Sequence, residues 1–165
     1  MRSRDVAFVF VGAGFPDRTP MKTASAMFDL REVPAGQVAV EASPDRSYDA
    51  GEVLSALSKA RPAGALVVGV ADLSLSMKGG VYVTGVNDPS RGVAAVSLME
   101  LKRAADPRTL RERLLKQIAH EVGDLVGLGH CSNPLCIMAF SEDPSQLDAK
   151  LPTLCADCGA RLASR

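Results

Sequence analysis

The residue types that bind transition metals are confined to the C-terminal part of this chain. Residues 1–119 contain neither cysteine nor histidine. The two histidines, His120 and His130, are followed within the last 35 residues by all four cysteines: Cys131, Cys136, Cys155 and Cys158. In a reducing compartment, a tight cysteine cluster more often binds a metal than forms disulfides. Any transition metal is therefore expected within residues 120–158.

The size and charge of the chain limit what surrounds this cluster. With 165 residues, 47% of them hydrophobic, we expect one domain: a sheet-rich scaffold over 1–106 and a metal-bearing part over 107–165. Nineteen basic residues balance nineteen acidic ones, so no net positive field attracts nucleic acid. Apolar runs are too short to span a membrane. Asp5 interrupts the first apolar stretch, and no signal-peptidase site follows it, so we expect a cytoplasmic protein, and a monomer.

The first two-thirds of the chain predict an α/β scaffold. Continuous apolar runs and β-branched residues indicate strands, whereas helical spacing and a following proline indicate a helix over 48–60. The expected strands cover 6–11, 26–32, 36–41, 64–70, 81–84 and 93–98. Gly12 and Gly14 suggest a plain turn, because no phosphate-loop lysine follows, and residues 87–90 suggest another. We therefore expect a mixed twisted sheet backed by helices.

A long helix is predicted over 107–127. Asp106 is a suitable N-cap, Pro107 suits the first turn, and Gly127 suits the C-terminal end. Its apolar stripe recurs at intervals of three and four: Leu110, Leu114, Ile118, Val122 and Leu125. Its basic residues are most simply a solvent-exposed face: Arg108, Arg111, Arg113 and Lys116, with Lys102 and Arg103 just before it.

The opposite side of this helix carries potential metal ligands. At roughly 100° per residue, His120 and Asp124 lie about 40° apart and project together. Gly127 and Gly129 allow the chain to fold back and bring His130 over the same face. Three potential ligands thus converge within eleven residues.

The full string resembles a known family of metalloproteases. Residues 120–138 read HEVGDLVGLGHCSNPLCIM, and after sixteen further residues comes CADC at 155–158. This is similar to the archaemetzincins, whose pattern is HExxHxxGxxHC, four residues, CxM, a spacer and CxxC. The resemblance implies a metzincin-like sheet, an active-site helix, a catalytic zinc, a structural zinc, and Met138 in a turn beneath the first metal. It also implies peptide substrates.

One position departs from the family pattern, because Asp124 replaces the second histidine. A carboxylate can ligate zinc, but it reaches roughly 1 Å less far than the distal imidazole nitrogen. It also partly neutralises the metal, which weakens it as a Lewis acid. Alternatively, Asp124 accepts a contact from His120 or His130 and holds the pocket together without a metal. Both possibilities stay open.

The residue types predict a mechanism if zinc binds. His120, Asp124 and His130 would leave a fourth position for water, and Glu121 would act as the general base. The alternative for Glu121 is an ordinary solvated helix carboxylate, and for Met138 a core filler. The cysteine spacing, C-x4-C-x18-C-x2-C, fits a tetrahedral structural zinc; buried thiols or one disulfide are the alternative.

The predicted function is that of a zinc metallopeptidase. One alternative is a catalytically impaired relative that keeps the structural zinc and only binds peptides, through a strand edge near 82–85 or 93–98. The other is a zinc-ribbon-like nucleic-acid binder. The composition of residues 131–165 disfavours this alternative. The segment has three basic residues (Lys150, Arg161, Arg165) against four acidic ones, and Phe140 is its one aromatic residue, so it lacks the positive charge and the stacking surface that bind nucleic acid.

Overall fold

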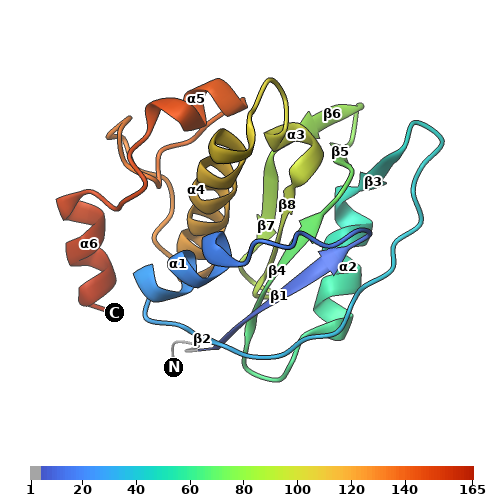
Figure 1. Cartoon of the computed structure of the whole chain (residues 1–165). Helices are drawn as coiled ribbons and strands as arrows, with labels where there is room; N and C mark the ends of the chain where they lie inside the picture. The colour runs from blue at the N-terminus through green and yellow to red at the C-terminus, as the bar shows by residue number, and fades with distance from the viewer. Residues whose placement is uncertain (1–4) are drawn as a thin grey trace.

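The computed structural model describes residues 5–165; residues 1–4, part of the predicted scaffold, lie outside this range. The first half of the chain mixes strands with two helices, five strands from β4 to β8 then follow one another, and the last part is helical and ends in two short helices (Figure 1). The elements are β1 (Asp5–Val11), α1 (Thr19–Met27), β2 (Arg31–Glu32), β3 (Ser47–Asp49), α2 (Ala50–Ala60), β4 (Leu66–Ala71), β5 (Ser74–Met77), β6 (Val81–Val83), β7 (Gly85–Asp88), β8 (Val93–Ser97), α3 (Leu98–Leu101), α4 (Pro107–Leu125), α5 (Pro144–Ala149) and α6 (Ala156–Ala163).

The main sheet is mixed, as predicted. Its strand order is β2-β1-β4-β8-β7, in which the first four strands run parallel and β7 pairs antiparallel with β8 at the edge. A smaller sheet has the order β3-β5-β6. Helices α1 and α4 cover one face of the main sheet and α2 the other, which confirms the predicted α/β class (Figure 1).

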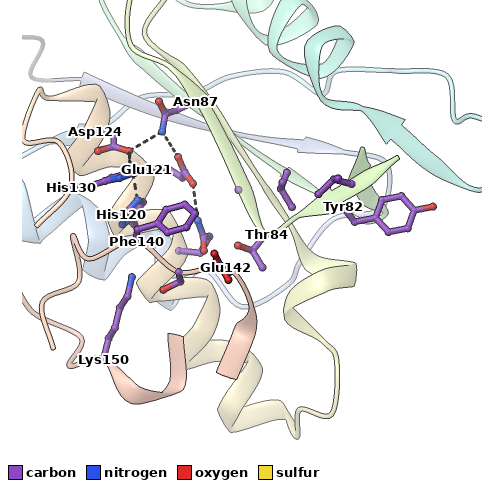
Figure 2. Close-up of a pocket in the computed structure, with 15 residues that line it drawn as sticks. Tyr82, Thr84, Asn87, His120, Glu121, Asp124, His130, Phe140, Glu142 and Lys150 are labelled. Carbon is purple, nitrogen blue, oxygen red and sulfur yellow. Dashed lines mark hydrogen bonds and ion pairs between the residues drawn. The ribbon is translucent and has the colours of Figure 1, made fainter. Parts of the chain in front are cut away.

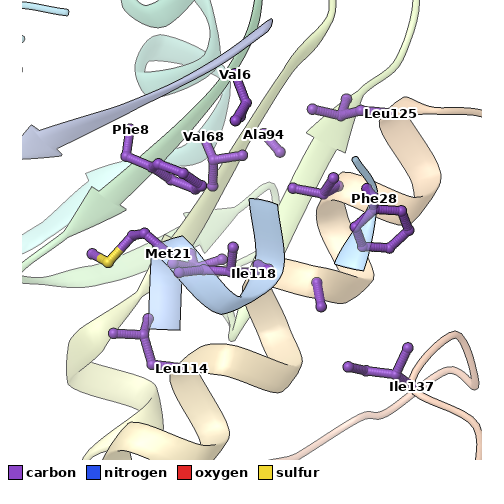
Figure 3. Packing of buried hydrophobic residues seen from close by; sticks show 14 of the residues in the cluster. Val6, Phe8, Met21, Phe28, Val68, Ala94, Leu114, Ile118, Leu125 and Ile137 are labelled. Atoms are coloured by element: carbon purple, nitrogen blue, oxygen red, sulfur yellow. The ribbon is translucent and has the colours of Figure 1, made fainter. Parts of the chain in front are cut away.

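Alternating side chains of the central strands supply two cores. Val6, Phe8 and Val68 point toward α1 and α4 (Figure 3). Ala7 and Val67 belong to the core on the α2 side. This follows from the period of two along a strand, with both faces of the parallel strands covered by helices.

Helix α4 forms where the sequence predicts it. The Asp106 carboxylate accepts a hydrogen bond from the Thr109 N–H at 2.7 Å, and Pro107 occupies the first helical position. The helix ends at Leu125, two residues before the predicted end, because Gly127 adopts a left-handed φ of +87° and turns the chain away. Every residue of the predicted apolar stripe packs into the core between α4 and the sheet.

The strands predicted over 26–32 and 36–41 are wrong for most of their length. Residues 19–27 form α1, because Pro20 starts a helix whose Met21 and Ala24, together with Phe28 just beyond its end, pack in the core beside α4. Only two residues of the first segment, those of β2, pair with β1. In the second segment, Val38 alone forms an isolated bridge with Val11. The turn predicted at 87–90 is wrong for Asn87 and Asp88, which belong to β7, and is confirmed for residues 89 and 90.

The basic face predicted on α4 is also wrong at two positions. Arg113 and Lys116 are buried, because the α5 segment packs over them. Arg113 donates two hydrogen bonds to the Asp148 carboxylate at 2.8 and 2.7 Å, and Lys116 donates to the Leu147 carbonyl at 3.0 Å. These bonds attach the tail to the helix that carries the candidate ligands. Within residues 5–165, no helix combines the length and apolar composition needed to cross a membrane.

Candidate metal centre

A pocket of about 600 Å³ opens over the second half of α4, between the β6–β7 strip and the loop that leads into α5. Figure 2 shows the side chains that converge on it from these three segments. Its lining residues are Val81, Tyr82, Val83, Thr84, Gly85, Asn87, Gln117, His120, Glu121, Asp124, His130, Phe140, Ser141, Glu142 and Lys150.

Three potential ligands meet in this pocket. One side-chain donor atom each from His120, Asp124 and His130 lies within 4.8 Å of the other two. The Asp124 Oδ2 atom is 3.6 Å from His120 Nε2 and 3.7 Å from His130 Nε2. Both separations exceed a hydrogen bond, and they are nearly equal. The geometry leaves space for a cation between the three donors.

The two histidines sit in different surroundings. His120 is buried, and its Nδ1 is 3.0 Å from the Ile137 carbonyl, which leaves Nε2 directed toward Asp124. Burial lowers the pKa of His120 and so favours the neutral ring that a metal requires. A ligating histidine usually has such an acceptor on its second nitrogen. The His130 side chain is 53% exposed and packs beside Phe140, with ring centroids 5.4 Å apart.

The Asp124 carboxylate supports the presence of a cation. Its Oδ2 accepts a hydrogen bond from Asn87 Nδ2 at 2.9 Å, whereas its Oδ1 is buried without a partner. In the part of the chain that the structure describes, one other buried side-chain polar atom has no partner: Ser141 Oγ, in the same pocket. Because unpaired buried oxygens are costly, these two indicate a polar occupant. Two imidazoles and a carboxylate fit zinc.

Glu121, next to His120 on α4, is buried rather than solvated. Gln117 Nε2 donates to its Oε1 at 2.7 Å, and Asn87 Nδ2 donates to its Oε2 at 2.7 Å. Burial raises the pKa of this carboxyl to about 7. The carboxyl fits under the edge strand because residue 85 is glycine: a Cβ there would lie 2.1 Å from Glu121 Oε1.

Met138, predicted to lie beneath the first metal, packs against α4 next to the pocket but does not line it. Met138 is fully buried against α4, where a Cβ on Gly123 would lie 2.2 Å from its sulfur atom. Lys150 is buried too: its ammonium group donates to the carbonyls of Ile137 and Ala139, on either side of Met138. Burial lowers the pKa of Lys150 to about 8.

The four cysteines form a second cluster. One sulfur atom from each lies within 4.8 Å of the others, and no disulfide joins them. Their sulfur atoms accept several hydrogen bonds, among them one from the Cys155 N–H to Cys136 Sγ at 3.3 Å and one from Arg161 Nη2 to Cys158 Sγ at 3.1 Å. A hydrogen bond from the backbone of Cys158 to the Cys155 thiol lowers the pKa of that thiol to about 7. Four sulfur donors leave no position for water, which is typical of structural zinc.

The structure therefore brings together both predicted ligand sets and Glu121, and it adds lining residues that the sequence reasoning missed. Among them are Gly85, Asn87, Gln117 and Lys150. Gln117 had a detectable signal, because it lies four residues before Glu121 and one turn away on the same helix. Asn87 had none, since its neighbours Asp88, Pro89 and Ser90 indicate a turn.

Comparison with known proteins gives a consistent set of relatives. Residues 57–164 match the sequence profile of peptidase family M54. An archaemetzincin of Aeropyrum pernix is 39% identical over 99 residues, which cover 60% of this chain and 54% of that protein. One from Thermococcus kodakarensis is 37% identical over 71% of this chain and 67% of its own length. The chain thus spans about half the length of the first of these relatives, and two-thirds of the second.

Solved structures share the fold. A crystal structure of a zinc-dependent peptidase from Methanocorpusculum labreanum has a TM-score of 0.81, with 28% identity over 94% of this chain and 99% of that one. An archaemetzincin from Methanopyrus kandleri also has a TM-score of 0.81, with 24% identity over 97% of this chain and 93% of its own. The second similarity supports the fold alone.

Proposed function

Because the chain belongs to peptidase family M54, the family of the archaemetzincins, we propose that it is a zinc metallopeptidase that hydrolyses peptide bonds. The observation that carries the proposal is the grouping of His120, Asp124 and His130 around one point of a pocket. Glu121 lies beside the first of them on the same helix.

In this proposal, the three clustered residues hold the catalytic zinc and Glu121 is the general base. The zinc ion would supply a Lewis acid that polarises the scissile carbonyl and acidifies a water molecule. Glu121 accepts the proton of that water and passes it to the departing amine. Gln117 and Asn87 restrict the carboxylate of Glu121 by donating to both of its oxygens, so its orientation is set before substrate binds.

We assign a second, structural zinc to Cys131, Cys136, Cys155 and Cys158. These residues come from the loop after α4 and from the start of α6, so the ion would cross-link the tail to the segment that carries His130. The Cys131 N–H already donates to the Met138 carbonyl at 2.9 Å. Metal bound here would stabilise both the tail and the chain segment around Met138.

The substrate would lie along the strip formed by β6 and β7. Residues 81–85 and Asn87 line one wall of the pocket, and β7 is the edge strand of the main sheet. An edge strand offers unpaired backbone groups to an extended peptide, which is a common mode of peptide recognition. Phe140, 61% exposed, stands on the opposite wall and gives an apolar contact for a substrate side chain.

The test is a Glu121→Gln substitution combined with zinc analysis. The wild-type protein is expected to hold two equivalents of zinc and to cleave a fluorogenic peptide mixture. The variant is expected to keep both equivalents but lose activity by about 100-fold or more, because the amide cannot accept a proton. Unchanged hydrolysis by the variant would contradict the assignment of the base.

A peptide-binding protein without catalytic activity is the second candidate, and the short reach of Asp124 favours it. Asp124 Oδ2 lies close enough to both imidazoles to pair with either ring when that ring is protonated, without a metal. This candidate predicts one zinc per chain, at the cysteines. It also predicts that Asp124→His raises the zinc content from one equivalent to two, whereas the peptidase holds two without this change.

A further inference from the structure

Asn87 is placed where one side chain contacts both acidic groups of the pocket. We propose that Asn87 is a positioning residue that aims Asp124 as a metal ligand and Glu121 as the base, which lets an aspartate serve in this ligand position. The inference rests on the proposed function, and its test separates the two.

The geometry of Asn87 is specific. Its Nδ2 donates to Asp124 Oδ2 at 2.9 Å and to Glu121 Oε2 at 2.7 Å, so one amide bridges the two carboxylates (Figure 2). An amide nitrogen carries two hydrogens, one for each bond. Asn87 pairs with Ala94 of β8, and within β7 its side chain points to α4, as does the Cβ position of Gly85. The position of the amide is therefore set by the main sheet rather than by a loop.

Asp124 needs such a partner more than a histidine would. A carboxylate rotates about its last torsion with a broad, two-fold preference, so packing alone does not fix its oxygens. Its Oδ1 has no partner, and its Oδ2 is beyond hydrogen-bond distance of both imidazoles. The amide of Asn87 is the group that holds Oδ2 on the side that faces His120 and His130.

The same amide separates two like charges. Glu121 and Asp124 are both largely buried on one helix, and burial strengthens the repulsion between their carboxylates. A donor shared between them offsets part of this repulsion and keeps each oxygen in place. Removal of the donor is therefore expected to affect metal binding through Asp124, and turnover through Glu121.

The metal-binding test uses Asn87→Leu, which keeps the approximate size of the side chain and removes both donors. Asp88→Asn is the matched control on the same strand, because Asp88 binds Ser90 and Arg91 outside the pocket. Each protein is loaded with zinc and dialysed against a moderate chelator until only the cysteine site is filled. It is then titrated with Co²⁺, and binding at the site of His120, Asp124 and His130 is followed by visible absorption. We expect Asn87→Leu to weaken this affinity 10- to 100-fold and Asp88→Asn to leave it unchanged.

A double-mutant cycle distinguishes positioning from general damage. In an Asp124→His background the amide keeps its bond to Glu121 but loses its acceptor at position 124, so Asn87→Leu is expected to change the Co²⁺ affinity less than about threefold. An equally large loss in both backgrounds, or no loss in the single variant, would overturn the proposal. A wild-type protein that takes up no second equivalent would overturn the metallopeptidase proposal along with it.

Turnover at saturating metal reports on Glu121. With both sites filled, Asn87→Leu is expected to lower kcat 10- to 100-fold while KM stays within about threefold, because Glu121 is misaligned and the peptide-binding strip is intact. An unchanged kcat would overturn the part of the proposal that concerns Glu121 and leave the part that concerns Asp124 to the affinity measurements.

Discussion

Substitution of Gly85 by alanine perturbs the proposed base without touching its own side chain. The added Cβ would lie 2.1 Å from Glu121 Oε1 and 2.4 Å from Gln117 Nε2. Both atoms are the ends of flexible side chains, so they move and the backbone stays. To reach ordinary contact at 3.4 Å, Glu121 Oε1 has to retreat by about 1.3 Å. The backbone at Gly85 tolerates alanine, because its φ is not positive.

The magnitudes follow from this displacement. A catalytic group misplaced by about 1 Å loses on the order of 100-fold in rate. Weakening the hydrogen bond from Gln117 costs about 1.5–3 kcal/mol, because the acceptor is a buried carboxylate, and the lower backbone entropy of alanine in the unfolded chain offsets about 0.4–1 kcal/mol. The net loss of about 0.5–2.6 kcal/mol corresponds to a fall in Tm of about 1–10 °C for a chain of this size.

The assay compares kcat, zinc content and Tm of Gly85→Ala with those of Gly36→Ala. Gly36 has no atom within 4 Å of its Cβ position and no positive φ, so its substitution is expected to be neutral in all three measurements. Gly85→Ala is expected to keep both zinc ions and lose about 100-fold in kcat. A kcat within threefold of wild type would refute the reasoning that the orientation of Glu121 depends on the glycine above it.

Three further predictions concern stability. Tyr48→Phe removes the hydroxyl that donates to Asp72 Oδ1 at 2.9 Å and is expected to cost about 1–2 kcal/mol in denaturant titrations. Burial, together with this bond, raises the pKa of Tyr48 to about 12, so the wild-type advantage should persist below about pH 10 and disappear as pH rises toward 12. Cys131→Ser is expected to remove one zinc equivalent by elemental analysis and at least about 3 kcal/mol of stability, because structural zinc contributes on the order of 10 kcal/mol. Gly159→Ala, in α6 with open space around its Cβ position, is expected to raise Tm by about 1–4 °C in calorimetry.

Helix α4 and the cluster of His120, Asp124 and His130 could be predicted because their signals are local, whereas the cysteine cluster is predicted from its spacing. Asp106 and Pro107 mark the start of the helix, the apolar stripe sets its buried face, and the ligand spacing follows from 3.6 residues per turn. The glycines at 127 and 129 both adopt positive φ, as the predicted return of the chain toward His130 requires. In this part of the chain, sequence neighbours are also spatial neighbours.

Asn87 and Lys150 could not be predicted because their roles depend on distant segments. Asn87 lies 34 residues before Glu121 in the sequence, and the pairing of β7 with β8 brings the two together. Lysine is a residue type that usually lies on the surface. Lys150 is buried because α5 folds back over α4. Composition and periodicity report on the local environment of a residue, whereas these two environments are created by tertiary packing.

The two clusters are connected through one short loop, which couples metal binding at one cluster to metal binding at the other. His130 and Cys131 are adjacent in sequence, and the Ile137 carbonyl opposite His120 directly follows Cys136. A zinc ion on the cysteines would therefore restrain one ligand of the first site directly, and the hydrogen-bond partner of another. The coupling is reciprocal, because a metal that raises the affinity of a second site must have its own affinity raised by the same factor. Loss of the cysteine zinc is thus expected to weaken metal binding at the histidine site, and loss of metal at the histidine site is expected to weaken zinc binding at the cysteines by the same factor.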